Sequence, residues 1–375
     1  MSLPVFHITG GSFYEVGVAH GRVAKDRIRG FLDLPYIGPL RSLRRSNGSV
    51  FFKELVKHNR KAFPDYADEI SGIAHGAQVE EDEIWMLNLL GELDGGHRYG
   101  IPSGMTSASP PISPRTRTPT PSDSACSSFD DGHCSSFIFK DESGDLLLAH
   151  NEDWDADVAD LIYLLDVTYP GDEHLVGFGY PGQFLGFAIV SNHHGLLFTQ
   201  NSVFPQKLEV GLGVTFVSRL AMKAARLEDA IEVLTTPGQA WGISVNLLSQ
   251  SEKIGANVEV GANGRSHVRY IAEPMAYAPH FNQYSHLIDA TGWAGPGSSA
   301  RTAHEQTKEP PGCLKDVTHR LCNRDGAGAV YNRTTFLSLI VEATERGAIS
   351  SLWHKVPPCG SQPTCVWHLG AGIVS

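Results

Sequence analysis

Apolar positions before residue 101 recur at the three- to four-residue spacing of amphipathic helices. Ser12 and Glu15 form a capping-box pattern at the start of the first such stretch, and Pro35 ends it. Helices are expected over residues 13–34, 50–62, 66–77 and 81–93. The chain from residue 1 to residue 101 is therefore predicted to be a helical N-terminal segment.

A different pattern begins at residue 134, where short apolar runs alternate with turn residues such as Ser143-Gly144 and His194-Gly195. We expect strands over residues 136–139, 146–150, 161–168, 184–191, 196–200, 244–248 and 268–272, and helices over 214–225 and 227–235. Strands joined by short turns favour antiparallel pairing. Residues 102–133, which are rich in Pro, Ser and Thr, separate the two parts as a predicted exposed loop. Residues 134–375 are the predicted catalytic core.

The composition is that of an ordinary enzyme, with 375 residues of which 41% are hydrophobic and 19% charged. The net charge of -11 argues against nucleic acid as a partner, because nucleic-acid binding normally requires clustered basic residues. No apolar run approaches the roughly 18 residues that span a bilayer, and the N-terminus lacks the pattern of a secretory signal. We therefore expect a cytoplasmic protein with a small-molecule partner and no membrane partner. A homo-oligomer is left open.

Six cysteines are too sparse for a disulfide scaffold, and they do not form the paired Cys-x-x-Cys pattern of a structural zinc site. We expect reduced, partly buried thiols. In an oxidising compartment, the pairs Cys313/Cys322 and Cys359/Cys365 could bridge. No metal or cofactor is expected.

Cys134 opens an apolar run over residues 134–139 and directly follows Gly132-His133. A thiol at the edge of a strand can attack the preceding carbonyl group, exchange the amide for a thioester and, after hydrolysis, leave the cysteine with a free α-amine. The amine titrates near about 7.7–8.0 and the thiol near about 8.5, so the amine can accept the thiol proton at neutral pH. The sequence therefore predicts an N-terminal nucleophile that carries its own base.

Several short motifs follow one another in a fixed order along most of the chain. The early ones are Tyr14-Glu15-Val16-Gly17 with His20-Gly21, and residues 63–66, 69–74 and 86–88. The later ones contain Cys134, Asp153 in Asn151-Glu152-Asp153, Asn201, Asn282 and Arg301. Together they resemble the acyl-coenzyme A:6-aminopenicillanic acid acyltransferase family of N-terminal nucleophile (Ntn) hydrolases.

The resemblance implies an α+β protein with the Ntn-hydrolase four-layer αββα sandwich, in which two antiparallel sheets follow a helical pro-segment. It also implies a precursor that is cut between His133 and Cys134. The N-terminal segment would then remain with the core as the α subunit. This is the partner expected within the chain itself.

The resemblance further assigns roles to single residues. Cys134 would attack the acyl carbon, and Asp153 would hold its ammonium group by a charge-assisted hydrogen bond. The Asn282 side-chain amide and the Asn201 backbone N–H would bind the tetrahedral oxyanion. Arg301 would pair with Asp153 or lower the pKa of the thiol.

The chain departs from the family pattern at two places. His133 precedes Cys134 where the family most often has glycine, and Cys126, which is followed by the same Ser-Ser-Phe, is a rival start. Glu152 replaces a tryptophan, so the run His150–Asp153 is nearer to the family's β-alanyl-amine hydrolases. A β-alanyl group carries an ammonium that needs a carboxylate. Three residues could provide it: Glu152, Asp155 and Asp157.

The leading hypothesis is an autoprocessed cysteine amidohydrolase that cleaves a small N-acyl amide through an acyl-thioester on Cys134. One alternative is acyl transfer from a thioester or amide to an amine, in which the amine replaces water. Another is an uncut scaffold with the Ntn fold and no activity. A Cys-His pair of protease type, formed with His133 or His150, is a further alternative for the nucleophile.

Overall fold

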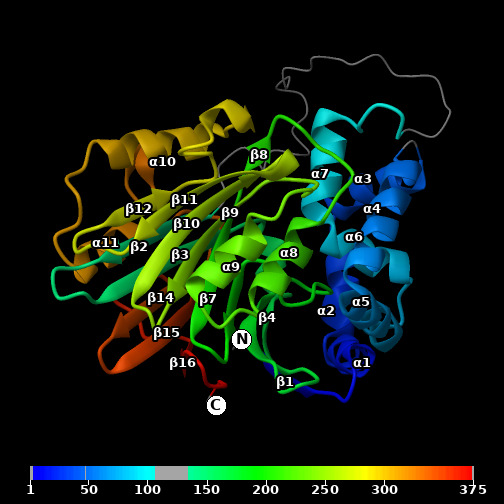
Figure 1. Ribbon diagram of the computed structural model, residues 1–375, viewed down its shortest axis with the longest axis horizontal. Coiled ribbons are helices and arrows are strands. Elements are labelled where there is room, and N and C mark those ends of the chain that lie inside the picture. The colour runs from blue at the N-terminus through cyan, green and yellow to red at the C-terminus, as the bar shows by residue number, and fades with distance from the viewer. Residues whose placement is uncertain (1–2, 47, 106–133, 374–375) are drawn as a thin grey trace.

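The computed structural model describes residues 3–46, 48–105 and 134–373, and within them two β-sheets lie face to face (Figure 1). The first sheet has the strand order β1 (Val5–Thr9), β4 (Tyr163–Thr168), β5 (His174–Gly179), β6 (Ile189–Asn192), β7 (Leu196–Ser202), β9 (Ile243–Ser249), β10 (Ile254–Gly261) and β11 (Arg265–Ile271). The second has the order β12 (Tyr277–His280), β2 (Ser135–Lys140), β3 (Leu146–Asp153), β14 (Thr335–Thr344), β15 (Gly347–His354) and β16 (Cys365–His368). Strands β8 (Phe204–Pro205) and β13 (Thr291–Trp293) form a separate short pair.

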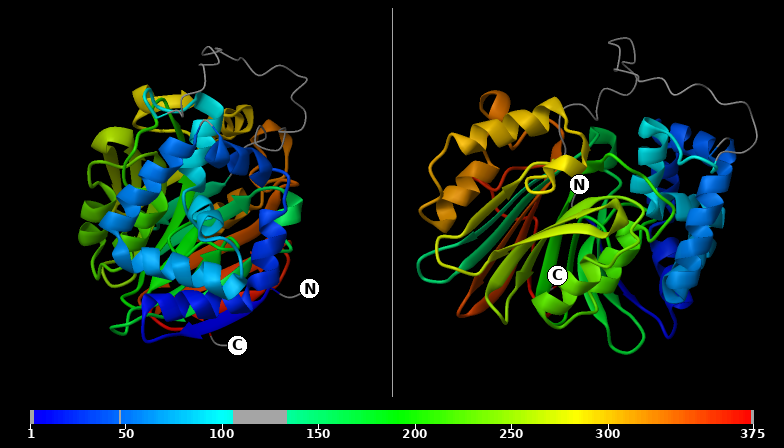
Figure 2. Two further views of the ribbon diagram at one scale, coloured as in Figure 1. Left: turned by 90° about the vertical axis from the view of Figure 1, so that its right-hand side faces the viewer. Right: turned by 45° about the horizontal axis from the view of Figure 1, so that its top comes forward.

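Helices cover the outer faces of both sheets. Helix α9 (Leu227–Leu234) contacts β9 and β10 of the first sheet and packs against α8 (Val214–Ala221). Helix α11 (Leu314–Leu321) contacts β2 and β3 of the second sheet, on the side where α10 (Pro296–Gln306) also lies (Figure 2). This order of layers confirms the predicted α+β Ntn-hydrolase sandwich. Because it is covered on both faces, β3 is buried at every position.

The N-terminal segment packs beside the first sheet (Figure 2). Its helices are α1 (Phe13–Val23), α2 (Lys25–Leu32), α3 (Ile37–Arg45), α4 (Ser49–Ala62), α5 (Pro64–Ala77), α6 (Glu81–Asn88) and α7 (Leu90–Tyr99). Strand β1 precedes them and pairs in parallel with β4, so the expectation of a wholly helical segment is wrong at its start. Five residues are too few for a stable helix but enough to complete a sheet edge. In the described part of the chain, no helix has both the length and the apolar character that a membrane span requires.

Most of the predicted elements exist, although several of their ends differ. The helix expected over residues 13–34 is two helices, because Ala24 leaves the helical conformation between them. The strand expected over residues 184–191 becomes regular only at Ile189. Helix α3 was not predicted, because the pair Gly38-Pro39 normally indicates the end of a helix. Pro39 lies in the first turn of α3, however, where a proline costs no helical hydrogen bond. Among the described strand pairs in the two sheets, only β1–β4 is parallel.

Helices α1 and α5 pack closely because glycines line their contact. A methyl group added at Gly17 would lie 2.1 Å from the carbonyl oxygen of Glu69, and one added at Gly72 would lie 2.2 Å from that of Tyr14. These distances are far below van der Waals contact, so only glycine allows the two backbones to approach this closely. The glycines of the early family-like motifs are thus explained by helix packing.

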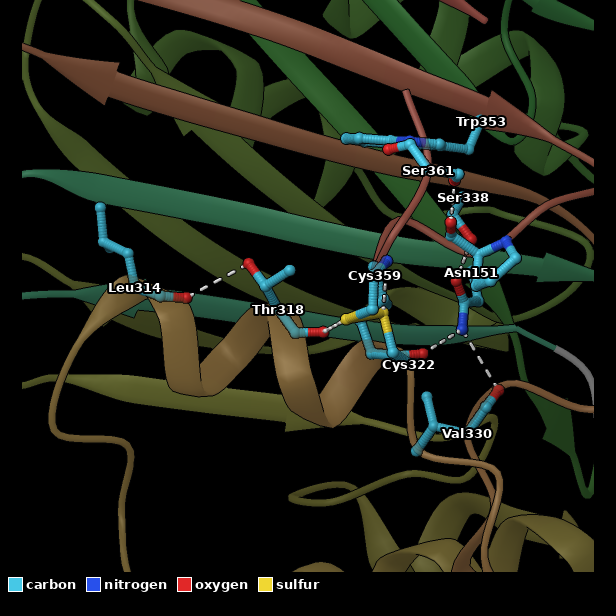
Figure 3. The surroundings of a disulfide bond; sticks show 11 residues. Asn151, Leu314, Thr318, Cys322, Val330, Ser338, Trp353, Cys359 and Ser361 are labelled. Carbon is cyan, nitrogen blue, oxygen red and sulfur yellow. Dashed lines mark hydrogen bonds between the residues drawn. A yellow bond between two sulfur atoms is a disulfide. The ribbon is translucent and has the colours of Figure 1, made fainter. Parts of the chain in front are cut away.

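Cys322, at the C-terminal end of α11, forms a disulfide with Cys359 in the loop between β15 and β16 (Figure 3). The prediction of reduced thiols is therefore wrong for these two residues, and so are the pairs Cys313/Cys322 and Cys359/Cys365. Cys313 and Cys322 flank the eight residues of α11, and this helix holds their thiols apart. The thiols of Cys313 and Cys365 are free.

Beside this disulfide, the Asn151 side chain joins β3 to the end of α11 and to the chain that follows it (Figure 3). Its Nδ2 donates to the carbonyl oxygens of Leu321 at 2.9 Å and Val330 at 3.2 Å. Its Oδ1 accepts a hydrogen bond from the Ser338 hydroxyl at 2.5 Å. The outer face of β3 is therefore fastened to its covering helix immediately before Glu152 and Asp153.

We predict that Gly72→Ala destabilises the protein by about 1–3 kcal/mol, because the new methyl group would force α1 and α5 apart. Urea denaturation measures this change. Gly38→Ala in α3 is the matched control: nothing lies within 4 Å of its added methyl group, and alanine favours a helix by about 0.5–1 kcal/mol. Equal stability of the two variants would contradict the close packing of α1 on α5.

Candidate active site

Cys134 lies just before β2, between the two sheets, with 4% of its surface exposed. In the β2–β3 pair Ser135 faces Asn151, and this register places Cys134 beside Glu152 and Asp153. Burial, reinforced by these two carboxylates, raises the pKa of the Cys134 thiol well above its usual range. The thiol of the intact chain is therefore neutral at pH 7 and needs a base before it can act as a nucleophile.

Glu152 and Asp153 approach Cys134 from opposite faces of the second sheet, because successive strand residues point to opposite sides. Asp153 faces the covering helices, where its Oδ2 accepts hydrogen bonds from Arg301 at 3.4 Å and Asn332 at 3.3 Å. The buried Oδ1 has no partner of hydrogen-bonding geometry among the described residues, although the Thr335 hydroxyl favours the ionised form. Burial raises the pKa of Asp153 to about 7. A cation placed at Oδ1 would therefore be strongly favoured.

Arg301 extends from the buried face of α10 and joins Asp153 to Asn282. Its Nη1 also donates to the Ser135 hydroxyl at 3.1 Å, and its Nη2 donates to Asn282 Oδ1 at 3.3 Å. Asn282 has a left-handed backbone with φ 63°, which asparagine tolerates better than most residues, and its Nδ2 donates to the Ser202 carbonyl at 3.0 Å. Burial lowers the pKa of Arg301 from its usual value. One hydrogen of the Asn282 amide remains for another acceptor.

Asn201 lies on the opposite side, on β7 of the first sheet, and is fully buried. Its Oδ1 accepts hydrogen bonds from Ser136 Oγ at 2.7 Å and from Asn246 Nδ2 at 2.8 Å. Its Nδ2 is a buried donor without a partner among the described residues. The structure thus brings the predicted residues Cys134, Asp153, Asn201, Asn282 and Arg301 into one buried region around the β2–β3 pair.

Glu152 faces the space between the sheets, on the same side of β3 as His150. Its carboxylate accepts a hydrogen bond from the Tyr180 hydroxyl at 2.6 Å, lies 2.8 Å from His150 Nε2, and is within 4.8 Å of the Cys134 sulfur. Burial raises the pKa of Tyr180 well above its usual range, which keeps this hydroxyl protonated as a donor. All these groups are buried.

Cys134, His150 and Glu152 also place a sulfur, a nitrogen and an oxygen within 4.8 Å of one another. Zinc accepts such ligands. In this arrangement, however, His150 and Glu152 are hydrogen-bonded to each other. Their ligand atoms therefore face one another and do not converge on a site for an ion.

A cavity opens beside Cys134 toward the N-terminal segment. Aromatic side chains form much of its wall: Trp154, Tyr180, Phe187, Phe204 and Trp241. Acidic groups reach it at Asp94, Glu152 and Asp153, whereas no lysine, arginine or histidine lines it among the described residues. The cavity therefore favours a neutral or cationic guest that carries apolar surface.

Asp94 brings a carboxylate into this cavity from α7, and Arg98 Nε supports it with a hydrogen bond of 2.7 Å. Burial raises the pKa of Asp94. Gln183 adds a buried Oε1 that has no partner within the described ranges, while its Nε2 donates to the Leu87 carbonyl at 2.7 Å. Both groups can accept hydrogen bonds from a guest.

Asp94 is not among the site residues expected from the sequence. The sequence signal for it is the unusual number of glycines around this residue in α7. A methyl group added at Gly95 would lie 2.5 Å from Trp241 Cζ3, so the glycine lets this indole pack directly on the helix. Glycine inside a predicted helix costs stability and indicates such a close approach.

The structure separates the three acidic residues that were expected to bind an ammonium group. Glu152 lines the cavity, whereas Asp157 is exposed on the turn Ala156–Val158. Asp155 is half-buried near Tyr36 and does not line the cavity. His133 and the rival start Cys126 lie outside the described residues.

Comparisons with known proteins support the resemblance seen in the sequence. The chain is 26% identical over 356 residues to the β-alanyl-dopamine/carcinine hydrolase of Drosophila melanogaster, covering 88% of this chain and 84% of that protein. A Caenorhabditis elegans N-acylethanolamine-hydrolyzing acid amidase ortholog covers 63% of this chain and 100% of its own, with 10% identity and a TM-score of 0.42. Penicillin V acylase from Agrobacterium tumefaciens covers 63% of this chain and 85% of its own, with 12% identity and a TM-score of 0.40. The family model for acyl-coenzyme A:6-aminopenicillanic acid acyl-transferase matches residues 139–337, more than half of the chain, and the chain therefore belongs to this family.

Proposed function

We propose that this protein is an autoprocessed cysteine amidohydrolase whose nucleophile is Cys134, released by a cut after His133. The observation that carries the proposal is Asp153, which the β2–β3 register places beside Cys134 and whose buried Oδ1 has no hydrogen-bond partner in the described chain. A new α-ammonium group on Cys134 would supply the missing cation. It would also favour the ionised carboxylate, whose pKa is raised to about 7 by burial.

After the cut, the α-amine of Cys134 would take the thiol proton, and the sulfur would attack the acyl carbon of an amide. The negative oxygen that forms would be held by the free hydrogen of the Asn282 amide and by Asn201. Loss of one such donor typically costs about 100- to 1000-fold in rate. The amine then leaves with the proton, and water resolves the thioester.

The cavity supports a substrate that carries a positive charge. Its wall combines carboxylates with aromatic rings and has no basic side chain among the described residues. Both carboxylate oxygens of Glu152 already have partners in Tyr180 and His150, which leaves Asp94 and Gln183 Oε1 as the better acceptors for an ammonium group. An amide with a β-alanyl group, as the name of the Drosophila relative suggests, fits this chemistry.

The N-terminal segment would stay in place as the α subunit after the cut. Strand β1 pairs with β4 along five residues, and α7 supplies Leu90, Gly91 and Asp94 to the cavity wall. Removing the segment would expose this wall and delete a predicted substrate ligand. The cytoplasmic location and the possible homo-oligomer stay predictions.

The first prediction concerns the cut itself. Under denaturing conditions, the freshly purified chain should give two masses that meet between His133 and Cys134, and the Cys134→Ala chain should give one. Hydrolysis and acyl transfer are then separated by assaying the cut protein with and without an amine acceptor. Intact chains in both preparations would refute the proposal and favour an uncut scaffold.

The second prediction tests the charge state of Asp153 in the uncut Cys134→Ala chain. Its pKa rises from 3.8 in the unfolded chain to about 7 in the folded chain, so the folded state binds more protons between these values. The free energy of unfolding should therefore fall as the pH rises through this window, by roughly 1–4 kcal/mol relative to the same chain with Asp153→Asn. Urea denaturation at a series of pH values measures the difference. Parallel pH profiles would contradict it.

The third prediction concerns the substrate charge. Asp94→Asn should lower kcat/KM about 10- to 100-fold for a β-alanyl amide, because a charged hydrogen bond is lost. For the butanoyl amide of the same aromatic amine, which has the same shape without the charge, the change should be much smaller. Asp68→Asn is the matched control, because Asp68 is an exposed carboxylate on α5. Equal losses in kcat/KM for both amides would show that Asp94 does not bind the ammonium group of the substrate.

A further inference from the structure

We propose that Glu152, coupled to His150, is the base that removes the thiol proton of Cys134 in the uncut chain. This inference rests on the proposed function, because it concerns the cut that creates the enzyme. The α-amine that serves the mature nucleophile is still part of a peptide bond before the cut. Another group must therefore activate the thiol for its first reaction.

The two carboxylates beside Cys134 contact the thiol differently. Asp153 contacts the sulfur through its backbone N–H, which is a donor and cannot accept a proton. Its side chain instead points to Arg301 and Asn332. The Glu152 carboxylate lies within 4.8 Å of the Cys134 sulfur and raises the pKa of the thiol. Of the two carboxylates, that of Glu152 is therefore the one placed to take the thiol proton.

A chain of hydrogen bonds between the sheets determines how His150 is protonated. Asn201 Oδ1 is an acceptor, so the single hydroxyl proton of Ser136 is donated to it over 2.7 Å. Ser136 Oγ, which lies 2.7 Å from His150 Nδ1, must therefore accept from the ring. This assigns the Nδ1 proton of His150 and leaves Nε2 facing Glu152.

One proton is consequently shared between His150 Nε2 and Glu152 Oε2, which are 2.8 Å apart. When the proton is on the ring, His150 is an imidazolium and Glu152 is a carboxylate that can accept the thiol proton. The Tyr180 hydroxyl holds the other carboxylate oxygen at 2.6 Å and keeps the group oriented. The charged and titratable groups around this pair are Cys134, Asp153 and Tyr180.

In the proposed step, the thiol proton moves to Glu152 as the bond forms between Cys134 Sγ and the preceding carbonyl carbon. The C–N bond of that peptide then breaks, and Glu152 returns the proton to the departing nitrogen of Cys134. One water molecule hydrolyses the resulting thioester. The products are a carboxylate at the end of the upstream fragment and a free amine and thiol on Cys134.

The test measures how fast newly made full-length chain is cut, using cell-free synthesis and intact mass at timed intervals. Glu152→Gln keeps the size of the side chain but removes its basicity, and it should slow the cut about 100-fold or more at pH 7. Glu69→Gln is the matched control, because Glu69 is an equally buried carboxylate that binds Tyr169 and does not line the cavity. It should be cut at the rate of the unaltered chain.

The pH profile separates a base from a structural group. In the Glu152→Gln chain the rate should rise about tenfold per pH unit, because hydroxide must replace the lost base, whereas the unaltered chain should level off near neutrality. His150→Gln, which leaves the carboxylate in place, should also slow the cut, and it decides the matter if Glu152→Gln does not fold. Cutting of Glu152→Gln at the unaltered rate and pH profile would overturn this inference alone. An unaltered chain that is never cut would overturn it together with the proposed function.

Discussion

Ionisable groups buried in a protein interior are stable only where the fold gives each one a partner, and the candidate active site depends on this constraint. Asp153 is buried with Arg301, and Glu152 is buried with His150 and Tyr180. The β2–β3 register places Glu152 and Asp153, which are neighbours in β3, next to Cys134. Burial makes it necessary that each carboxylate has a partner, and it also keeps the Cys134 thiol neutral. Burial therefore makes activation of the nucleophile dependent on an adjacent base.

The covering layers are part of this arrangement. Asn151 fastens the chain around α11 to β3, and the Cys322–Cys359 disulfide fastens the end of α11 to the loop between β15 and β16 (Figure 3). The loop that follows α11 provides Asn332 to Asp153. On the other side, the N-terminal segment is joined to the first sheet by β1. Each layer thus contributes a polar contact near Cys134 as well as apolar surface.

Short-range features of the site could be predicted from the sequence, because a hairpin brings its own strands together. The proximity of Cys134 and Asp153 follows from two short strands and one turn, and the structure has both strands. Asp94 and the disulfide could not be predicted, since they depend on where separate layers dock. A glycine-rich helix signals that something approaches closely, but it does not say that the neighbour is Trp241.

Glu152 stands where the family pattern has a tryptophan. Its position in β3 places this additional carboxylate on the face opposite to that of Asp153. Asp153 faces the covering helices, where it would hold the ammonium group that the proposed cut creates. Glu152 faces the opposite side, where the chain through His150, Ser136 and Asn201 sets its proton state. Two adjacent carboxylates therefore lie on opposite faces of one strand, next to Cys134. Under the proposed cut, this separation would allow one of them to act before the α-amine exists and the other to act once it has formed.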